Sequence, residues 1–123
     1  MTTSAEAKAY NWDTVRREDV TELFTRQLVW GEKVMLARLE LKTGCVVPQH
    51  SHENEQVSMV TSGVIRFWLG EQREQRDLRA GDVLVIPAHV LHEAEVLEDF
   101  TGIDVFTPPR QDWLDGTDAY LRR

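Results

Sequence analysis

Apolar and polar residues alternate over several short stretches of the chain, as they do in β-strands that bury one face. In residues 33–41, for example, apolar Ala37 and Leu39 alternate with charged Arg38 and Glu40. The same kind of pattern predicts strands over residues 26–30, 33–41, 56–61, 64–69, 72–78, 83–86, 91–96 and 101–107. The stretch 72–78 is heavily charged, so we expect it to be an exposed strand. The pattern therefore predicts an all-β protein.

Turn-forming residues separate these stretches at intervals of about eight to twelve residues, which is typical of a β-sandwich or barrel. Gly31 and Glu32 predict a hairpin turn between the first two strands. Ser62 with Gly63, and Glu98 with Asp99, predict two more turns. Pro108 and Pro109 end the last strand, because proline cannot donate to the ladder.

The two ends of the chain have weaker patterns. Residues 1–9 are expected to form a loose tail, and residues 16–24 a short helical turn with a connector. Residues 112–121 are predicted to form a short helix or to lie over the mouth of a barrel. A chain of 123 residues suits one core, so we expect a single domain over 1–123 with its barrel at about 26–110.

Composition narrows the possible partners. A net charge of −7 argues against binding to nucleic acid or to anionic membranes. No apolar run reaches the roughly 20 residues that cross a bilayer, and the first residues lack the apolar stretch of a secretory signal. Cys45 is the only cysteine, which excludes an internal disulfide and predicts a packing role. A cytoplasmic location is therefore expected.

Candidate metal ligands lie in the middle of the chain. His50 and His52 have the same parity in an extended segment, so their side chains can project to one side together with that of Gln56. Converging imidazoles are a common beginning of a metal site. His92 follows a second segment rich in glycine and proline and is the third candidate.

These two segments resemble the paired motifs of the cupin superfamily. The positions that match the family spacing are Gly44, His50, His52 and Gly63 in the first motif, and Gly81, Pro87 and His92 in the second. Three positions depart from the family pattern: Gln56 replaces Glu, His89 replaces the second glycine, and Val96 replaces Asn. His89 stands in a turn position, so we do not expect it to bind metal.

The resemblance implies a single cupin jelly-roll β-barrel with one bound divalent metal ion. The implied ligands are His50, His52, Gln56 and His92. Imidazole and amide ligands admit manganese, iron, nickel or zinc, so the metal stays open. The resemblance also implies a homodimer.

Gln56 changes the chemistry that this site favours. Three neutral imidazoles and a neutral amide leave the full dipositive charge on the ion, whereas a carboxylate would cancel part of it. An ion with its full charge is a stronger Lewis acid and binds an anionic oxygen more tightly. The ligand set therefore favours Lewis-acid chemistry over redox chemistry.

The last predicted strand carries a second group of candidates. Asp104 and Phe106 share one parity, and an acid within a strand is unusual. Asp104 faces the barrel interior if its neighbours pack between the sheets, and otherwise lies on a solvated face. Arg110 follows the two prolines and either folds over the mouth to bind a carboxylate or lies on the surface.

The segment from Asp104 to Arg110, with the proposed ligand set, resembles one subgroup of small cupins, the pectin-degradation proteins that open unsaturated uronate rings. That resemblance implies acid–base work for Asp104, sugar contact for Phe106 and anion contact for Arg110. We also place Ser58 in the substrate site. The expected function is ring opening or isomerisation of an unsaturated uronate, or of a similar keto or enol acid, and thus a small anionic substrate. The alternatives are a non-catalytic module that binds a sugar or another small molecule, and a metal-dependent dioxygenase.

Overall fold

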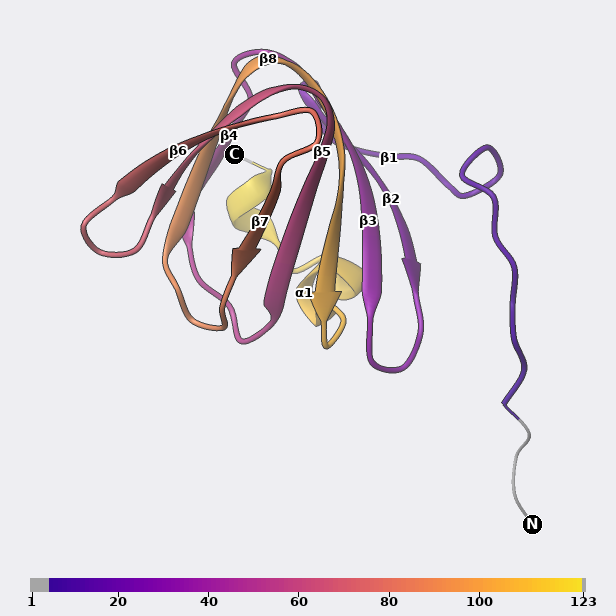
Figure 1. The fold of residues 1–123 in the computed structure, drawn as a ribbon. Coiled ribbons are helices and arrows are strands. Elements are labelled where there is room, and N and C mark those ends of the chain that lie inside the picture. Colours follow the sequence, from indigo (N-terminus) through magenta and orange to yellow (C-terminus); the bar gives the residue numbers. More distant parts are fainter. Residues whose placement is uncertain (1–4, 123) are drawn as a thin grey trace.

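The computed structural model describes residues 5–122, which fold into a barrel of β-strands (Figure 1). The strands are β1 (Glu18–Thr21), β2 (Phe24–Trp30), β3 (Met35–Leu41), β4 (Val46–His50), β5 (Glu55–Leu69), β6 (Glu74–Arg79), β7 (Val83–Ile86) and β8 (His92–Thr107). A short helix, α1 (Gln111–Asp115), and one 3-10 turn, η1 (Ala119–Leu121), follow. The predicted fold class, an all-β jelly roll with a short C-terminal helix, is confirmed.

Two long antiparallel strands, β5 and β8, run through the whole barrel. They pair along almost their full length, from Glu55 opposite Thr107 to Leu69 opposite His92. One half of this pair lies in a sheet with β1, β2, β3 and β7, and the other half lies between β4 and β6. The barrel therefore consists of two sheets that share β5 and β8.

The turns predicted at Ser62–Gly63 and at Glu98–Asp99 are wrong, because β5 and β8 bend there without ending. The pairing shifts register between Val60 and Ile65, as at a barrel corner. Gly63 has φ +84°, and a Cβ atom on it would lie 2.1 Å from the carbonyl oxygen of Asp99. This close approach requires glycine. Because glycine also marks turns, the sequence alone does not distinguish a bend within a long strand from a turn between two strands.

The helical turn predicted within residues 16–24 is also wrong. Glu18–Thr21 forms β1, which pairs antiparallel with β2 and buries Val20 while leaving Asp19 exposed. The stretch is too short for its alternation to be recognised. At the N-terminus, residues 1–4 of the predicted tail lie outside the described residues, and residues 5–9 are exposed without regular secondary structure.

The core lies between the two sheets. The alternation in β3 matches its burial, because Met35, Ala37, Leu39 and Leu41 are all buried. Cys45 is buried with them, and burial raises the pKa of its thiol to about 11, so it packs as a neutral side chain. Within residues 5–122, no helix is both long and apolar enough to cross a membrane.

A buried ion pair attaches the C-terminal segment to the barrel. Arg26 on β2 and Asp118 have fully buried side chains, and Arg26 Nη1 lies 2.7 Å from Asp118 Oδ2. These two atoms are not aligned for a hydrogen bond, so the contact is mainly Coulombic. Arg26 Nε also donates to Glu18, and Arg122 bonds both Glu18 and Asp118. Asp118 and Arg122 are thereby fixed against β1 and β2.

Replacing Asp118 with Asn should lower the free energy of unfolding by about 3 kcal/mol, because the buried Arg26 charge loses its fully buried counter-charge and keeps only the partly exposed Glu18. For a domain of this size, this corresponds to a decrease of about 10 °C in melting temperature. Arg122→Ala is the matched control: it removes a partly exposed partner of the same carboxylate and should cost less than about 1 kcal/mol. Equal melting temperatures for Asp118→Asn and the wild type would show that the pair does not stabilise the fold.

Candidate metal centre

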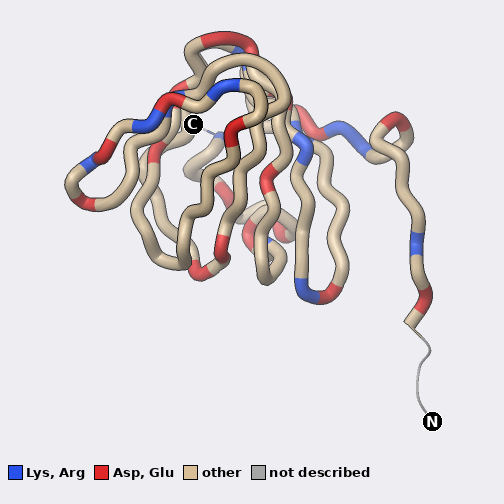
Figure 2. The backbone as a smooth tube through the Cα atoms, viewed as in Figure 1, with Lys and Arg blue, Asp and Glu red and all other residues tan. Residues whose placement is uncertain are grey.

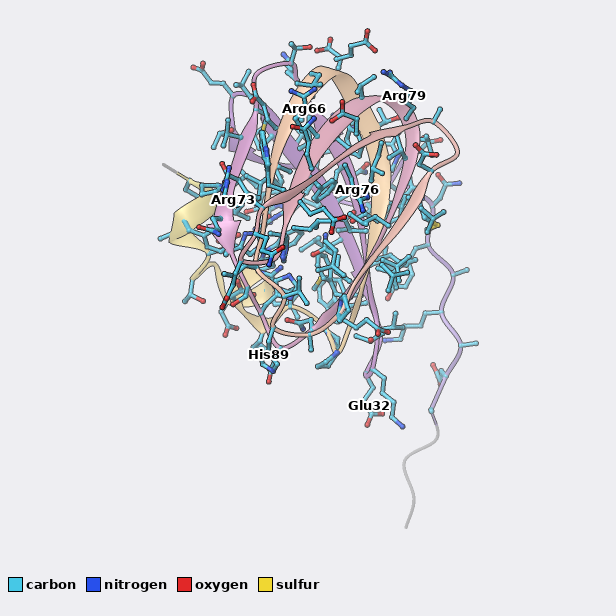
Figure 3. The ribbon with its side chains drawn as sticks, turned by 60° about the vertical axis from the view of Figure 1, so that its left-hand side comes forward. Glu32, Arg66, Arg73, Arg76, Arg79 and His89 are labelled. Carbon is cyan, nitrogen blue, oxygen red and sulfur yellow. The ribbon has the colours of Figure 1, made fainter. Side chains whose placement is uncertain are left out.

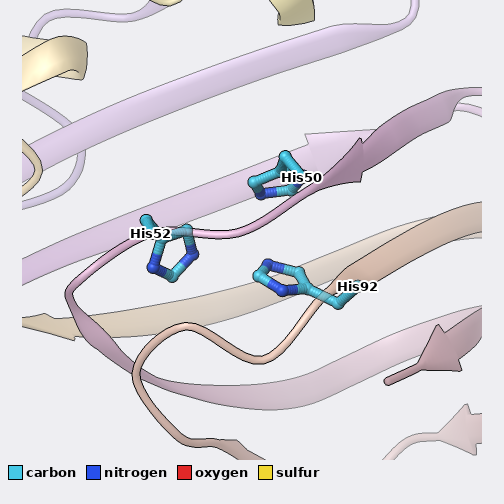
Figure 4. Close-up of side chains that lie close together, drawn as sticks. All are labelled: His50, His52 and His92. Atoms are coloured by element: carbon cyan, nitrogen blue, oxygen red, sulfur yellow. The ribbon is translucent and has the colours of Figure 1, made fainter. Parts of the chain in front are cut away.

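Strand pairing brings the three predicted histidines together. His50, at the end of β4, lies opposite His92, the first residue of β8, and His52 follows β4 in a loop. The ring centroids of His50 and His92 are 4.2 Å apart, and those of His52 and His92 are 4.9 Å apart. One nitrogen from each ring lies within 4.8 Å of the others. The rings converge on one point (Figure 4), as the sequence predicts.

Backbone carbonyls fix the orientation of all three rings. The Nδ1 atoms of His50, His52 and His92 lie 2.7, 3.0 and 2.9 Å from the carbonyl oxygens of Pro48, Asn54 and Val90. Because a carbonyl oxygen only accepts, each Nδ1 carries the proton, and each Nε2 presents its lone pair. Metal-binding histidines are commonly held in this way.

The charge state of the rings suits metal binding. Burial, with the neighbouring His92 as a further cause, lowers the pKa of His50 to about 3. Burial also lowers the pKa of His92 to about 4, and burial and Arg110 lower that of His52. The rings are therefore neutral at neutral pH. His92 Nε2 is buried without a hydrogen-bond partner, which is costly unless a cation occupies its lone pair.

The contacts of Gln56 also indicate a metal site. Its Oε1 atom lies 3.1 Å from His52 Nε2, and its Nε2 atom donates to Ser58 Oγ and to Asp104 Oδ2. A neutral imidazole has one N–H, and His52 already uses it toward Asn54. Two lone pairs therefore face each other, and a shared cation resolves this repulsion. The four predicted ligands thus fit a divalent metal ion.

Asp104 lies inside the barrel, which decides between the two orientations left open by the sequence. It is 8% exposed and stands on β8 opposite Ser58 of β5. Burial raises the pKa of its carboxyl to about 6, although Ser58 and Arg110 oppose this shift. Its carboxyl can therefore exchange a proton near neutral pH. Phe106 is buried on the same side, with its ring 5.8 Å from that of His52.

Arg110 is buried rather than on the surface. Its guanidinium donates through Nε and Nη2 to the Asp112 carboxylate, and Nη2 also donates to the Tyr120 hydroxyl. The rings of Phe106 and Trp113 lie 5.1 and 4.9 Å from it. The carboxylate that this arginine binds in the structure is thus that of Asp112, and its contact with a substrate anion stays a prediction.

The C-terminal segment contributes residues that the sequence did not identify. The Tyr120 ring lies 4.8 Å from the His50 ring, and the guanidinium groups of Arg26 and Arg110 lie 4.5 and 4.9 Å from the Trp113 ring. Both prediction alternatives for residues 112–121 hold, because the segment forms α1 and also closes the barrel. In the sequence, the only indication of their role was that Trp113 and Tyr120 are aromatic residues that follow Pro108 and Pro109.

The cavity beneath the histidines is small. It has a volume of about 40 Å³ and is lined mainly by apolar residues of the core, with His50, Gln56, Asp104, Arg110 and Tyr120 among its polar lining. This volume accommodates a few water molecules but not a sugar acid. A larger ligand must therefore bind at the mouth or displace Tyr120.

His89 takes no part in the centre, as predicted. It is exposed at the surface (Figure 3), and its φ of +69° is one that glycine adopts more easily. Its backbone N–H donates to the carbonyl oxygen of His52 at 2.8 Å. The residue therefore supports the histidine loop through its backbone only.

The metal-free protein should lose stability as the pH falls from about 6.5 toward 4. In this window the unfolded chain protonates its histidines while the folded chain, with the pKa values of His50 and His92 lowered to about 3 and 4, does not. Asp104 acts in the opposite direction between about 4 and 6, because its pKa is raised, but it is a single group. Thermal unfolding at several pH values measures the profile. His92→Gln should make the melting temperature depend less on pH in this window. An unchanged dependence in this variant would show that His92 does not cause the loss of stability.

Three comparisons place the chain among known proteins. A protein-family model described as Cupin domain matches residues 37–104. The structure of KdgF from Halomonas sp. is similar, with a TM-score of 0.79 and 30% identity over 86% of this chain and 99% of that chain. An RmlC-like cupin from Shewanella frigidimarina has a TM-score of 0.79 and 26% identity, over 89% of this chain and 96% of that one.

A curated relative, a germin-like protein from Ipomoea nil, is 32% identical over 99 residues. The match covers 76% of this chain but only 46% of the relative, so the chain spans about half of its length.

Proposed function

The chain belongs to the cupin family, and from this premise we propose that it is a metal-dependent enzyme acting on a small anionic sugar acid. The proposed reaction is ring opening or isomerisation of an unsaturated uronate, or of a similar keto or enol acid. One observation carries the proposal: a buried carboxyl with a pKa of about 6, on Asp104, is hydrogen-bonded to the same Gln56 amide that faces the histidine cluster. A group that can carry a proton therefore lies beside the proposed metal site.

The residues that would hold the metal are His50, His52, Gln56 and His92. When bound, a divalent ion supplies Lewis-acid polarisation of a substrate oxygen and attracts an anionic group. The resemblance to pectin-degradation cupins and the likeness to KdgF both support a uronate as the substrate.

Asp104 is proposed as the acid–base group. Ser58 and Gln56 hold its carboxylate in one orientation, and its raised pKa lets it accept a proton from a substrate hydroxyl and return it to carbon. The proton moves between two substrate atoms, so no other reactant is required. Phe106, which is buried beside Asp104, is proposed to contact the sugar ring once the substrate has entered the barrel.

We propose that the positive charge of Arg110 attracts and binds the substrate carboxylate. Aromatic rings fix its position, and Asp112 and Tyr120 accept its hydrogen bonds. Because the cavity is small, we propose that the substrate displaces Tyr120 from His50 and then meets the guanidinium.

The proposal is tested by mixing unsaturated uronates with protein loaded separately with manganese, iron, nickel or zinc. Loss of absorbance from the conjugated double bond, removed by a chelator and restored by metal, is the expected result. Substrate binding without turnover for every metal would instead indicate a binding module. Oxygen consumption by the iron-loaded sample would indicate a dioxygenase.

Replacing Gln56 with Glu should retain the metal but weaken binding of an anionic ligand, because the carboxylate cancels part of the metal charge. About a tenfold loss of affinity is expected, which corresponds to about 1.4 kcal/mol. Titration calorimetry with a uronate that is not turned over measures this change. An unchanged affinity would contradict the argument from charge.

A further inference from the structure

A fixed negative charge lies beside the buried arginine of the candidate metal centre. Asp112, on α1, accepts hydrogen bonds from Arg110 Nε and Nη2 at 3.0 and 2.9 Å. Burial raises the pKa of Asp112, but these hydrogen bonds outweigh burial and lower it below its ordinary value. Asp112 is therefore ionised at neutral pH, and its charge cancels that of the guanidinium.

Arg110 lines the cavity, whereas Asp112 does not. Among residues 5–122, the charged side chains that line the cavity are those of Arg110 and Asp104. Tyr120 also lines it and accepts a hydrogen bond from Arg110 Nη2 at 2.6 Å. A ligand can therefore replace the Tyr120 hydroxyl on this guanidinium while Asp112, whose side chain is 33% exposed, stays bonded to it from outside the cavity.

Arg110 does not depend on Asp112 alone for its position. The Phe106 and Trp113 rings lie 5.1 and 4.9 Å from its guanidinium, and its side chain is only 2% exposed. Packing and stacking therefore restrict this planar group, in addition to its hydrogen bonds. We expect the main effect of Asp112 on a ligand to be its charge rather than the placement of the arginine.

The charge of Asp112 also acts on the histidine cluster. Burial lowers the pKa of His52, Arg110 lowers it further, and Asp112 opposes both effects. A group that stabilises a positive charge on His52 repels a negative charge placed beside that ring. The charged residues of α1 are both acidic, Asp112 and Asp115, and their positions are red in Figure 2, so the helix itself contains no cation that offsets this repulsion.

The charges around the centre balance for one kind of ligand. The three histidines and Gln56 are neutral, and Arg110 and Asp112 cancel each other. A divalent ion would leave two positive charges, of which an ionised Asp104 offsets one, and buried charges are stable only when they are balanced. The ligand therefore has to supply one negative charge.

We propose that Asp112 selects ligands with a single negative charge, such as a sugar acid with one carboxylate, over ligands with two. The inference rests on the proposed function for the place of the ligand, beside Arg110. Asp112 repels each negative charge on a ligand, so a second carboxylate or a phosphate dianion meets an additional penalty. Without Asp112 the same centre would have one more positive charge to balance and would accept a dianion more readily.

Titration calorimetry with zinc-loaded protein tests the proposal, because zinc has no redox chemistry. The probes are galacturonate with one carboxylate, galactarate with two, and the neutral methyl ester of galacturonate. Two carboxylates on one guanidinium lie roughly 6 Å apart, and in a partly exposed site their repulsion corresponds to about a tenfold change in affinity. Asp112→Asn should therefore bind galacturonate about tenfold more tightly, galactarate about thirtyfold or more, and the ester as the wild type does.

Asp115→Asn is the matched control. It removes the same charge from the same helix, but Asp115 is exposed and accepts its hydrogen bond from Gln111 rather than from Arg110. It should change each affinity by less than about twofold. Asp112→Glu keeps the charge and should show the wild-type preference.

Circular dichroism and elemental analysis verify the fold and the zinc content, and Asp112→Ser replaces Asp112→Asn if the latter does not fold. A folded neutral variant overturns the proposal if the ratio of its galactarate and galacturonate affinities is unchanged, or if it binds galacturonate more weakly than the wild type. Absence of galacturonate binding to every protein also overturns it. These measurements do not depend on turnover: if no unsaturated uronate is converted while the ratio still shifts, the proposed reaction is wrong and the role of Asp112 stands.

Discussion

Replacing His92 with Ala is expected to abolish stoichiometric metal binding. His92 is 3% exposed, and its Nε2 atom is a buried lone pair with no hydrogen-bond partner, directed at the point where the rings converge. Removing one of three imidazoles leaves two neutral nitrogens and an amide, which hold a divalent ion poorly. Elemental analysis of the purified variant measures the loss. A chelator should lower the melting temperature of the wild type but not of the variant.

His89→Gly is the control for this experiment. It removes an exposed histidine three residues away, at a φ of +69° that glycine accepts, and leaves the centre untouched. It should therefore retain one metal ion per chain. One metal ion per chain in His92→Ala would show that the ligand set is wrong.

Replacing Asp104 with Asn is expected to reduce turnover by about 10²–10⁴-fold while fold and metal content stay unchanged. Asparagine keeps the shape of the side chain and can still accept the hydrogen bond from Gln56, but it cannot carry the proton. In the wild type, turnover should fall as the pH decreases through about 6, where the Asp104 carboxyl becomes protonated, or at a lower pH if the bound cation lowers its pKa. This decline should be absent from the residual activity of the variant.

Asp77→Asn is the matched control, because Asp77 is an acid on β6, outside the cavity, and pairs with Arg66. Normal turnover in Asp104→Asn would exclude Asp104 as the proton carrier. A loss of substrate affinity without a loss of turnover would give Asp104 a binding role instead.

The local parts of the fold and the site could be predicted from the sequence. The alternation in β3 is set by its own residues, so the strand could be predicted, and the parity of Ala37 and Leu39 is the buried one. His50 and His52 stand two residues apart on one segment, and the spacing of the second motif indicated His92. In these cases the information lies within a few neighbouring positions.

The parts that were missed depend on residues far apart in the chain. Nothing in the sequence near Arg26 indicates that it is buried, because its buried counter-charge, Asp118, lies at the other end of the chain. Tyr120 lies beside His50 in a segment that this pair and the hydrogen bond from Arg110 attach to the barrel. Gly63 was interpreted as part of a turn because the approach of Asp99 comes from another strand. Such contacts between distant residues could not be predicted from the composition of the chain or from the spacing of its residues.

The anchored C-terminal segment determines how the protein is best handled. Asp118, Tyr120 and Arg122 connect the final residues to Arg26, His50 and Glu18, so an affinity tag fused at that end would begin next to the contacts that shape the cavity. A tag at the opposite end would join residues that precede the exposed stretch 5–9. We therefore expect a tag at the N-terminus to disturb the centre less than one at the opposite end.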